Sequence, residues 1–411
     1  MAKISRVLGG LILAALVYLL FSELIGIVAG VVIALLIGIL YFVSSITSRL
    51  LVGVLFIISG FIKANDPLGF SYKLDEYFNV FHMPWLSGIS LWLAIGICAF
   101  EIGLGVALLL GSKMKFTSWS LLLMIIFFTF LTFWSWKFDV VKDCGCFGDA
   151  LHLKPFQSFL KDLILLVLIL DIFSVHKAIK PIFGERFSTV LAYGGFLASF
   201  LFSLYCYRHL PVKDFRPYAV GKNITEGMQL PPNAVKDSIV MVFIYEKDGK
   251  NVELNMDQLK TIDDTYKFVD RKDKVIREGD KPPIHDFTIN TVDGTEITKD
   301  VLSMKNVFLL VAYELNHSDN DVQNRVNDFV ALCQRDGIEF IGLTSSSAKE
   351  VDEYRHKHNS MFEYYYSDAT MLKTMIRSNP GLMLLKNGTV TAMWHYNDFP
   401  TYDEVKSLLS K

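Results

Sequence analysis

Cysteine is scarce in this sequence: five cysteines are spread over 411 residues. A disulfide framework needs many cysteines within a small secreted domain, so the scarcity excludes that class of protein. A basic surplus is missing as well, because the formal net charge is −2. Surfaces that bind nucleic acid carry clusters of lysine and arginine, and we therefore expect no nucleic-acid partner.

Long apolar runs are missing after residue 208, although they dominate the chain before it. The apolar share of 52% is therefore concentrated in the first half, and charged residues are frequent in the second. Such a division is typical of a membrane-embedded part joined to a water-soluble part. The sequence predicts a multi-domain protein in which an all-α polytopic membrane helix bundle precedes a soluble region.

A helix that crosses a membrane needs about 20 mostly apolar residues. Several runs approach or meet this length with the help of flanking residues: 48–62, 91–110, 119–136, 159–172 and 190–207. The run 7–42 is too long for one crossing, and we interpret it as two spans with Glu23 at the bend, because a carboxylate at mid-bilayer is costly. About seven transmembrane helices are therefore predicted, a hairpin over residues 1–48 and the rest over residues 49–207.

The placement of lysine and arginine predicts the orientation of this bundle. With the N-terminus inside, the inner segments carry the denser positive charge, and the outer loops mix lysines with acidic residues. Seven crossings then place the loop 137–157 and everything after residue 208 on the outer side. The lipid membrane is the first partner that the sequence indicates.

Two charged residues interrupt the apolar pattern. Glu101 stands near the middle of the run 91–110, and Lys63 ends the run 48–62. A lone carboxylate costs several kcal/mol in a membrane, so Glu101 is expected to be protonated or paired, with Lys63 as one candidate partner. Two interpretations stay open: a neutral glutamate hydrogen-bonded between helices, or a proton relay or polar contact for a bound cofactor.

Cys144 and Cys146 are the one pair of cysteines that lie close together in the sequence. They can close a small disulfide ring if the loop turns, which Gly145 permits. A disulfide under such constraint tends to be reducible and suits exchange chemistry. A structural disulfide, a metal contact or inert thiols are the alternatives. A zinc site would need two more ligands and only His152 is nearby, so no metal site is predicted.

The combination of several motifs resembles the DoxX/MauE group of small four-helix membrane proteins. These motifs are Gly-Phe-Ile-Lys at residues 60–63, Asp66-Pro67, Glu101, and Asp-Cys-Gly-Cys-Phe-Gly-Asp at residues 143–149. The resemblance covers roughly residues 49–175 and implies a four-helix core within the bundle. The stretch 214–218 after the last span is similar to a long form of DoxX-like protein common in Bacteroidetes envelopes.

The resemblance implies a protein of the bacterial inner membrane with its C-terminal domain in the periplasm. Members of the group are linked to the maturation of a disulfide-rich periplasmic dehydrogenase subunit and to quinone-linked thiol oxidation. Carried over, Cys144 and Cys146 would be the catalytic residues. Lys63 and Glu101 would contact a quinone cofactor.

The soluble tail shows two patterns. Residues 208–280 indicate a small β-rich unit, with a hairpin turn at 247–250 and a second hairpin within 266–277. Residues 281–411 alternate strands with helices and resemble the thioredoxin-like fold of the peroxiredoxin and TlpA type. The expected elements are strands 306–313 and 337–344, helices 319–335, 347–359 and 402–409, and a hairpin over 382–394. Pro380 stands where that fold has its cis-proline.

The Cys-x-x-Cys of thioredoxin-like enzymes is missing from this tail. The corresponding residues 314–319 contain no cysteine, and Cys333 falls on the apolar side of the next helix, where a core position is expected. His317 is expected to be an exposed loop residue. We therefore expect the domain to bind a periplasmic protein client rather than to exchange disulfides itself.

Two functions stay open at this point, and whether the protein is an enzyme depends on which one holds. In the first, Cys144 and Cys146 shuttle disulfides in the cell envelope, quinone accepts electrons and the tail recruits a client. In the second, the protein is a non-enzymatic membrane scaffold with structural cysteines and a partner-binding tail. Transport through the bundle would rest on Glu101 alone.

Overall fold

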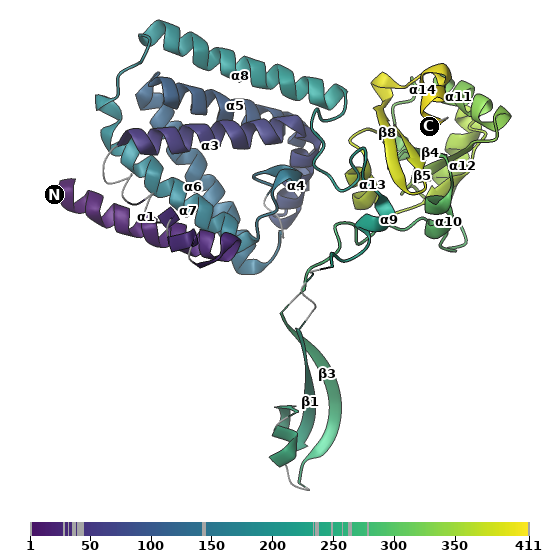
Figure 1. Ribbon diagram of the computed structural model, residues 1–411, viewed down its shortest axis with the longest axis horizontal. Coiled ribbons are helices and arrows are strands. Elements are labelled where there is room, and N and C mark those ends of the chain that lie inside the picture. The colour runs from purple at the N-terminus through teal and green to yellow at the C-terminus, as the bar shows by residue number, and fades with distance from the viewer. Residues whose placement is uncertain are drawn as a thin grey trace.

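A computed structural model describes residues 2–27, 29–31, 33–34, 38, 45–141, 145–232, 234, 238–247, 250–256, 258–261, 265–277 and 279–409. Figure 1 shows three parts: a bundle of long helices, an α/β domain beyond one end of that bundle, and a narrow β-sheet that extends away from both. The N-terminus lies at the end of the bundle remote from the α/β domain.

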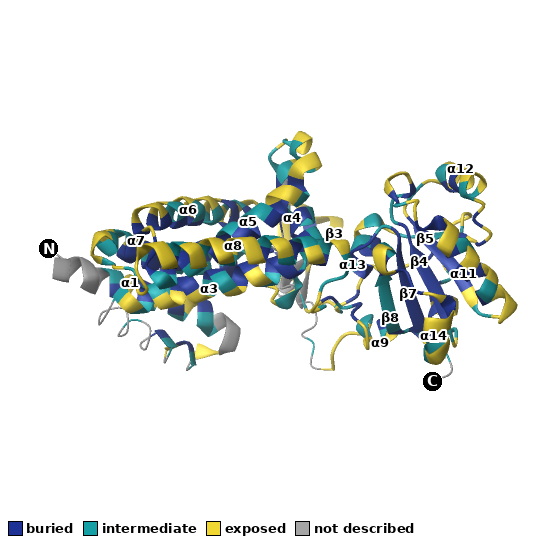
Figure 2. Cartoon of the chain, turned by 90° about the horizontal axis from the view of Figure 1, so that it is seen from above, coloured by how far each residue is buried: buried dark blue, intermediate teal, exposed yellow. Residues whose placement is uncertain are grey.

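The helical part consists of long helices that run side by side, with the shorter α4 at the end nearest the α/β domain (Figures 1 and 2). Their bounds are α1 Ala2–Ile25, α3 Ser45–Asn65, α4 Pro67–Val80, α5 Ser90–Leu110, α6 Met114–Phe138, α7 Pro155–Val175 and α8 Glu185–Arg208. Short 3-10 turns are η1 Pro84–Ile89, η2 Gly148–Ala150 and η3 His176–Ala178. Large apolar side chains are exposed along these helices, as expected for a lipid-facing surface, among them Phe116, Leu123, Phe127, Leu197 and Leu201.

The prediction of seven transmembrane helices is wrong for the described residues. Four helices are long and apolar enough to cross a membrane: Ser45–Asn65, Pro84–Leu110, Met114–Phe138 and Glu185–Arg208. Helix α7 covers the predicted span 159–172 but is not among these four candidate spans, because it carries three charged residues, Lys161, Asp162 and Asp171. Its Asp162 and Asp171 are buried against the other helices, so polar contacts inside the bundle account for the charges that break the apolar run.

The predicted N-terminal hairpin over residues 1–48 stays a prediction, because the structure describes only part of it. Helix α1 continues past Glu23 to Ile25, where Gly26 with φ of 93° follows. A positive φ is open to glycine and ends a right-handed helix. The apolar stretch within α1, Gly9–Ser22, is shorter than a membrane crossing requires. Much of the predicted second half, up to residue 42, lies outside the described residues.

The narrow sheet has three antiparallel strands in the order β2-β1-β3, with bounds β1 Ser238–Lys247, β2 Lys250–Asn255 and β3 Lys267–Arg277. Lys247 pairs with Lys250 in the register, which confirms the first predicted hairpin. The second predicted hairpin is wrong, because residues 267–277 form one continuous strand paired with β1. A 3-10 turn, η4 Gln258–Thr261, lies between β2 and β3.

The α/β domain is built on a five-stranded sheet in the order β6-β5-β4-β7-β8. Strands β4, β5 and β6 are parallel, whereas β7 runs antiparallel to β4 and to β8. Their bounds are β4 Val307–Val311, β5 Glu339–Thr344, β6 Tyr364–Tyr366, β7 Gly381–Lys386 and β8 Thr389–His395. The helices are α9 Ile224–Gly227, α10 Thr298–Ser303, α11 Gln323–Arg335, α12 Ala348–His358, α13 Ala369–Met375 and α14 Tyr402–Leu409, with 3-10 turns η5 Leu315–His317 and η6 Tyr396–Asp398.

Apolar clusters cover both faces of this sheet, and the buried strands stand out in Figure 2. One cluster includes Ile224 and Phe287, which precede the first strand of the sheet at Val307 by 83 and 20 residues, so segments before the sheet belong to its core. The strand order and directions resemble a thioredoxin-like fold, as predicted, and the peptide bond Asn379–Pro380 is cis. Cys333 is fully buried in the cluster on the other face, which confirms its expected core position.

Candidate functional site

Lys63 and Glu101 form a buried ion pair between α3 and α5. Gly60 allows the two helices to approach closely, because a Cβ at this position would lie 2.8 Å from Ile102 and 3.2 Å from Glu101. One turn further along α3, Lys63 Nζ donates to Glu101 Oε1 at 2.5 Å. The two side chains are 3% and 4% exposed. The contact that the sequence suggested between these residues is therefore present.

Aromatic rings enclose the ammonium group of this pair. Lys63 Nζ lies 5.1 Å from the centre of the Phe70 ring and 5.4 Å from that of Phe128. Such positions add cation–π attraction to the charge of Glu101. Glu101 Oε2 is buried and has no hydrogen-bond partner among the described residues. A buried acceptor without a partner is costly, so this oxygen is a place where a water molecule or a proton would be favourable.

The segment between α6 and α7 that carries Cys144 and Cys146 is called the cysteine loop below. Its described residues around Cys146 lie against α3 and α4. Cys146 is half-buried, and its carbonyl oxygen accepts a hydrogen bond of 3.0 Å from the hydroxyl of Ser59. Gly145 has a φ of 67° and approaches α4 so closely that a Cβ would lie 3.0 Å from Lys73. Cys144, the other predicted catalytic residue, lies outside the described residues.

A small cavity of about 20 Å³ connects the cysteine loop with the ion pair. Its lining includes Cys146, Ser59, Lys63, Glu101, Lys161 and Asp162. A volume of this size holds about one water molecule. It has no room for a quinone ring, so the cofactor that the resemblance implies does not fit inside this cavity.

A second ion pair in this cavity was not singled out from the sequence. Lys161 Nζ lies 2.6 Å from Asp162 Oδ1, and Thr132 donates to Asp162 Oδ2 at 2.9 Å. Asp162 is 1% exposed. The signal that could have revealed it was the Lys-Asp step inside the apolar run 159–172, because charges inside a span face a polar partner rather than lipid.

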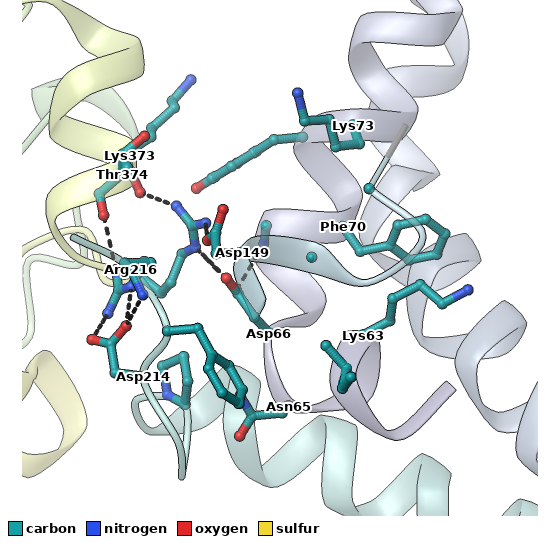
Figure 3. A pocket seen from close by; sticks show the side chains of 18 of the residues that line it. Lys63, Asn65, Asp66, Phe70, Lys73, Asp149, Asp214, Arg216, Lys373 and Thr374 are labelled. Carbon is teal, nitrogen blue, oxygen red and sulfur yellow. Dashed lines mark hydrogen bonds and ion pairs between the residues drawn. The ribbon is translucent and has the colours of Figure 1, made fainter. Parts of the chain in front are cut away.

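A much larger cavity of about 750 Å³ lies on the other side of the loop, between the bundle and the α/β domain. Figure 3 shows its walls: Lys63, Asp66 and Lys73 from α3, α4 and the turn between them, Asp149 from the cysteine loop, and Lys373 and Thr374 from α13. Lys63 lines both cavities. The volume lies in the range of small-molecule sites, and the wall carries charges of both signs.

Two further cysteines and one histidine lie apart from this site or inside the packing. Cys98 and Cys206 are 0% and 1% exposed, as expected for packing residues. His317 is exposed and pairs with Glu314 in the same turn. The site thus brings together Lys63, Glu101 and Cys146 among the predicted residues.

The fold combines a helical region that has four candidate membrane spans among the described residues with an α/β domain that resembles the thioredoxin fold. Residues 31–174 match the family described as Methylamine utilisation protein MauE, so the helical part contains a MauE family domain, which confirms the resemblance to that group. Residues 239–278, the narrow sheet, match a family described as Domain of unknown function (DUF8463). No curated protein sequence matches the chain.

Two solved structures are similar to about a third of the chain. One is the solution structure of a proposed protein disulfide isomerase from Bacteroides thetaiotaomicron, with 16% identity, a TM-score of 0.25, and coverage of 30% of this chain and 82% of that one. The other is the bacterioferritin comigratory protein of Xanthomonas campestris, with 12% identity, a TM-score of 0.23, and coverage of 30% and 88%.

Proposed function

We propose that this protein carries out thiol–disulfide exchange at Cys144 and Cys146 on the periplasmic face of the bacterial inner membrane. The observation that carries the proposal is the position of the cysteine loop between two cavities: Cys146 lines the small charged cavity, and its neighbour Gly145 lines the large one. Reactive cysteines sit in partly exposed surroundings with a nearby cation, and Lys63 is such a cation. Structural cysteines are usually enclosed by apolar side chains, as Cys98 is.

The exchange needs no reactant besides the partner thiols. A thiolate of the client attacks one sulfur of the Cys144–Cys146 disulfide, so that a mixed disulfide forms and the other loop sulfur leaves as a thiolate. A second client thiolate then attacks the mixed disulfide, which leaves an oxidised client and a reduced loop. Two protons, released by the two client thiols, accompany the two electrons to the loop, so the exchange balances.

We infer that the cysteine loop and the α/β domain lie on the same side of the membrane, which requires α7 to cross it together with α8. Arg377 of the α/β domain pairs with Asp149 of the loop at 3.2 Å, and a bilayer cannot pass between them. We place this side in the periplasm, where disulfides persist. A maleimide that cannot cross membranes should label Cys146 in intact cells after reduction; protection from it would argue for the opposite orientation.

Trapping of a mixed disulfide tests the exchange. Cys146→Ser leaves Cys144 as the single loop thiol, and Cys144→Ser leaves Cys146. At least one variant should capture a thiol-containing client as an adduct that a reductant releases, and the control Cys333→Ala in the wild-type loop should behave as the wild type. If neither variant captures a client and maleimide labelling of the wild-type loop is insensitive to reductant, the cysteines are inert and the scaffold function is preferred.

A further inference from the structure

The face of the α/β domain that contains the cis-proline is turned toward the helical bundle of the same chain. Arg377, three residues before Pro380, is 6% exposed and forms ion pairs of 2.8 Å with Asp66 and 3.2 Å with Asp149. The hydroxyl of Tyr313 at the end of β4 lies 3.2 Å from that of Tyr72 on α4. The face beside the cis-proline is therefore occupied within the chain and is not open to the protein client that we expected this domain to bind.

Arg377 joins three segments that are far apart in the sequence. Asp66 begins α4, and its carboxylate also accepts from the backbone N–H of Gly69. Asp149 lies three residues after Cys146, in the turn that closes the cysteine loop. One guanidinium thus ties the loop and the start of α4 to the α/β domain, and its planar fork suits two carboxylates.

Gly69 provides the space for this contact. A Cβ at position 69 would lie 2.7 Å from Arg377 Nη2 and 2.5 Å from Asp66 Oδ2. Any side chain there would displace the guanidinium, although every charge would remain.

We propose that Arg377 is a positioning residue for the cysteine loop and that the α/β domain acts in cis as a wall of the exchange site. By holding Asp149 against α4, Arg377 fixes the described part of the loop between the two cavities and limits access to the Cys146 thiol. A client then enters through the 750 Å³ cavity and not along the cis-proline edge. The proposal rests on the proposed exchange function, but the position of the loop can be measured without turnover.

The test measures the rate at which a bulky maleimide modifies Cys146 in the reduced full-length protein in detergent, with Cys144→Ser as background. Arg377→Gln and Gly69→Ala should each raise the rate by about tenfold, because loss of one partner of a buried pair releases the loop. Asp149→Asn should raise the rate by a similar factor. The double variant Asp149→Asn with Arg377→Gln should react no faster than either single variant, since both changes break the same contact.

Matched controls separate positioning from general loosening. Arg355 of α12 also forms an ion pair within the α/β domain, with Glu363 at 3.2 Å, and a Cβ at Gly96 meets nothing within 4 Å. Arg355→Gln and Gly96→Ala should leave the rate within about twofold of the background protein. Arg377→Lys keeps the positive charge but loses the planar guanidinium. Its alkylation rate should lie between that of the background protein and that of Arg377→Gln.

An unchanged rate in Arg377→Gln and Gly69→Ala would overturn the proposal, as would an equal rise in Arg355→Gln. If Arg377→Gln does not fold, Gly69→Ala and Asp149→Asn carry the test, because they lie outside the α/β domain. Failure of the exchange function gives a different result: the alkylation rates respond as expected, but no variant captures a client.

Discussion

At the scale of single residues, the pair of Lys63 and Glu101 is the most demanding contact in the helical bundle. Two charges that are 3% and 4% exposed have lost nearly all their water, and only their mutual contact and the rings of Phe70 and Phe128 compensate. The sequence revealed Glu101 because it interrupts an apolar run. The Lys161–Asp162 pair was harder to recognise, since opposite charges next to each other occur on most protein surfaces.

Removing the charge of one partner of this pair should lower the free energy of unfolding more than removing both charges together. Glu101→Gln leaves an ammonium buried without a counter-charge, and we expect a loss of about 3–5 kcal/mol in the free energy of unfolding. In Lys63→Met with Glu101→Gln the charges disappear together, and most of the loss should be recovered. Unfolding by SDS in mixed micelles measures the difference; a double variant as unstable as Glu101→Gln would contradict this account.

At the scale of elements, helices and strands with a strong local sequence pattern could be predicted, whereas short elements could not. The turn Asn387-Gly388 defined the β7–β8 hairpin, and Ser347 with Glu350 forms a capping box that begins α12. Strand β6 has three residues and α13 has seven, too few for a periodic pattern. Yet the end of α13 leads to Arg377, so the missed element is the one that contacts the cysteine loop.

The narrow sheet is predicted to be dispensable for the rest of the fold. The chain leaves the α/β domain after α9 and returns at Ile284, whose N–H donates to the carbonyl of Gly227 at 2.9 Å. The two ends of the segment between α9 and Ile284 are therefore adjacent in space, and a short glycine-serine linker can replace residues 231–281. The melting temperature of the shortened protein should stay within about 3 °C of the full chain; a larger fall would mean that the sheet supports the fold.

At the scale of the whole molecule, the contact between bundle and α/β domain could not be predicted. Arg377 and Asp66 are separated by 311 residues, and no local pattern links them. Burial acts to raise the pKa of Asp66, but the guanidinium groups of Arg377 and Arg216 hold this pKa below its ordinary value. Burial raises the pKa of Asp149, despite the nearby charge of Arg377.

These shifts predict that the two parts separate in acid. A carboxyl with a depressed pKa contributes stability above its unfolded pKa, near 4, and loses it as the pH falls through the folded value. Asp149 acts in the opposite sense, because its raised pKa favours the protonated form in the docked state. Distances between spin labels on α4 and α12 should increase below about pH 4.

The same distance measurement distinguishes the contribution of the Asp66 carboxyl from that of the Asp149 carboxyl. Asp66→Asn should abolish the acid step and leave the parts partly separated at every pH, whereas Asp149→Asn should retain it. An acid step that persists in Asp66→Asn would assign the effect to another group.

The short connection from α8 to the α/β domain has a consequence for any competing protein. His209 pairs with Asp398, and the side chain of Asn65 makes two hydrogen bonds to the backbone of Lys213, so the connecting segment is itself held at the end of the bundle. Such a tether keeps the α/β domain at an effective concentration of the order of millimolar beside the cysteine loop. An external protein that displaces the domain must bind the loop tightly enough to outcompete that local concentration, whereas a small thiol that fits the cavity faces no such competition.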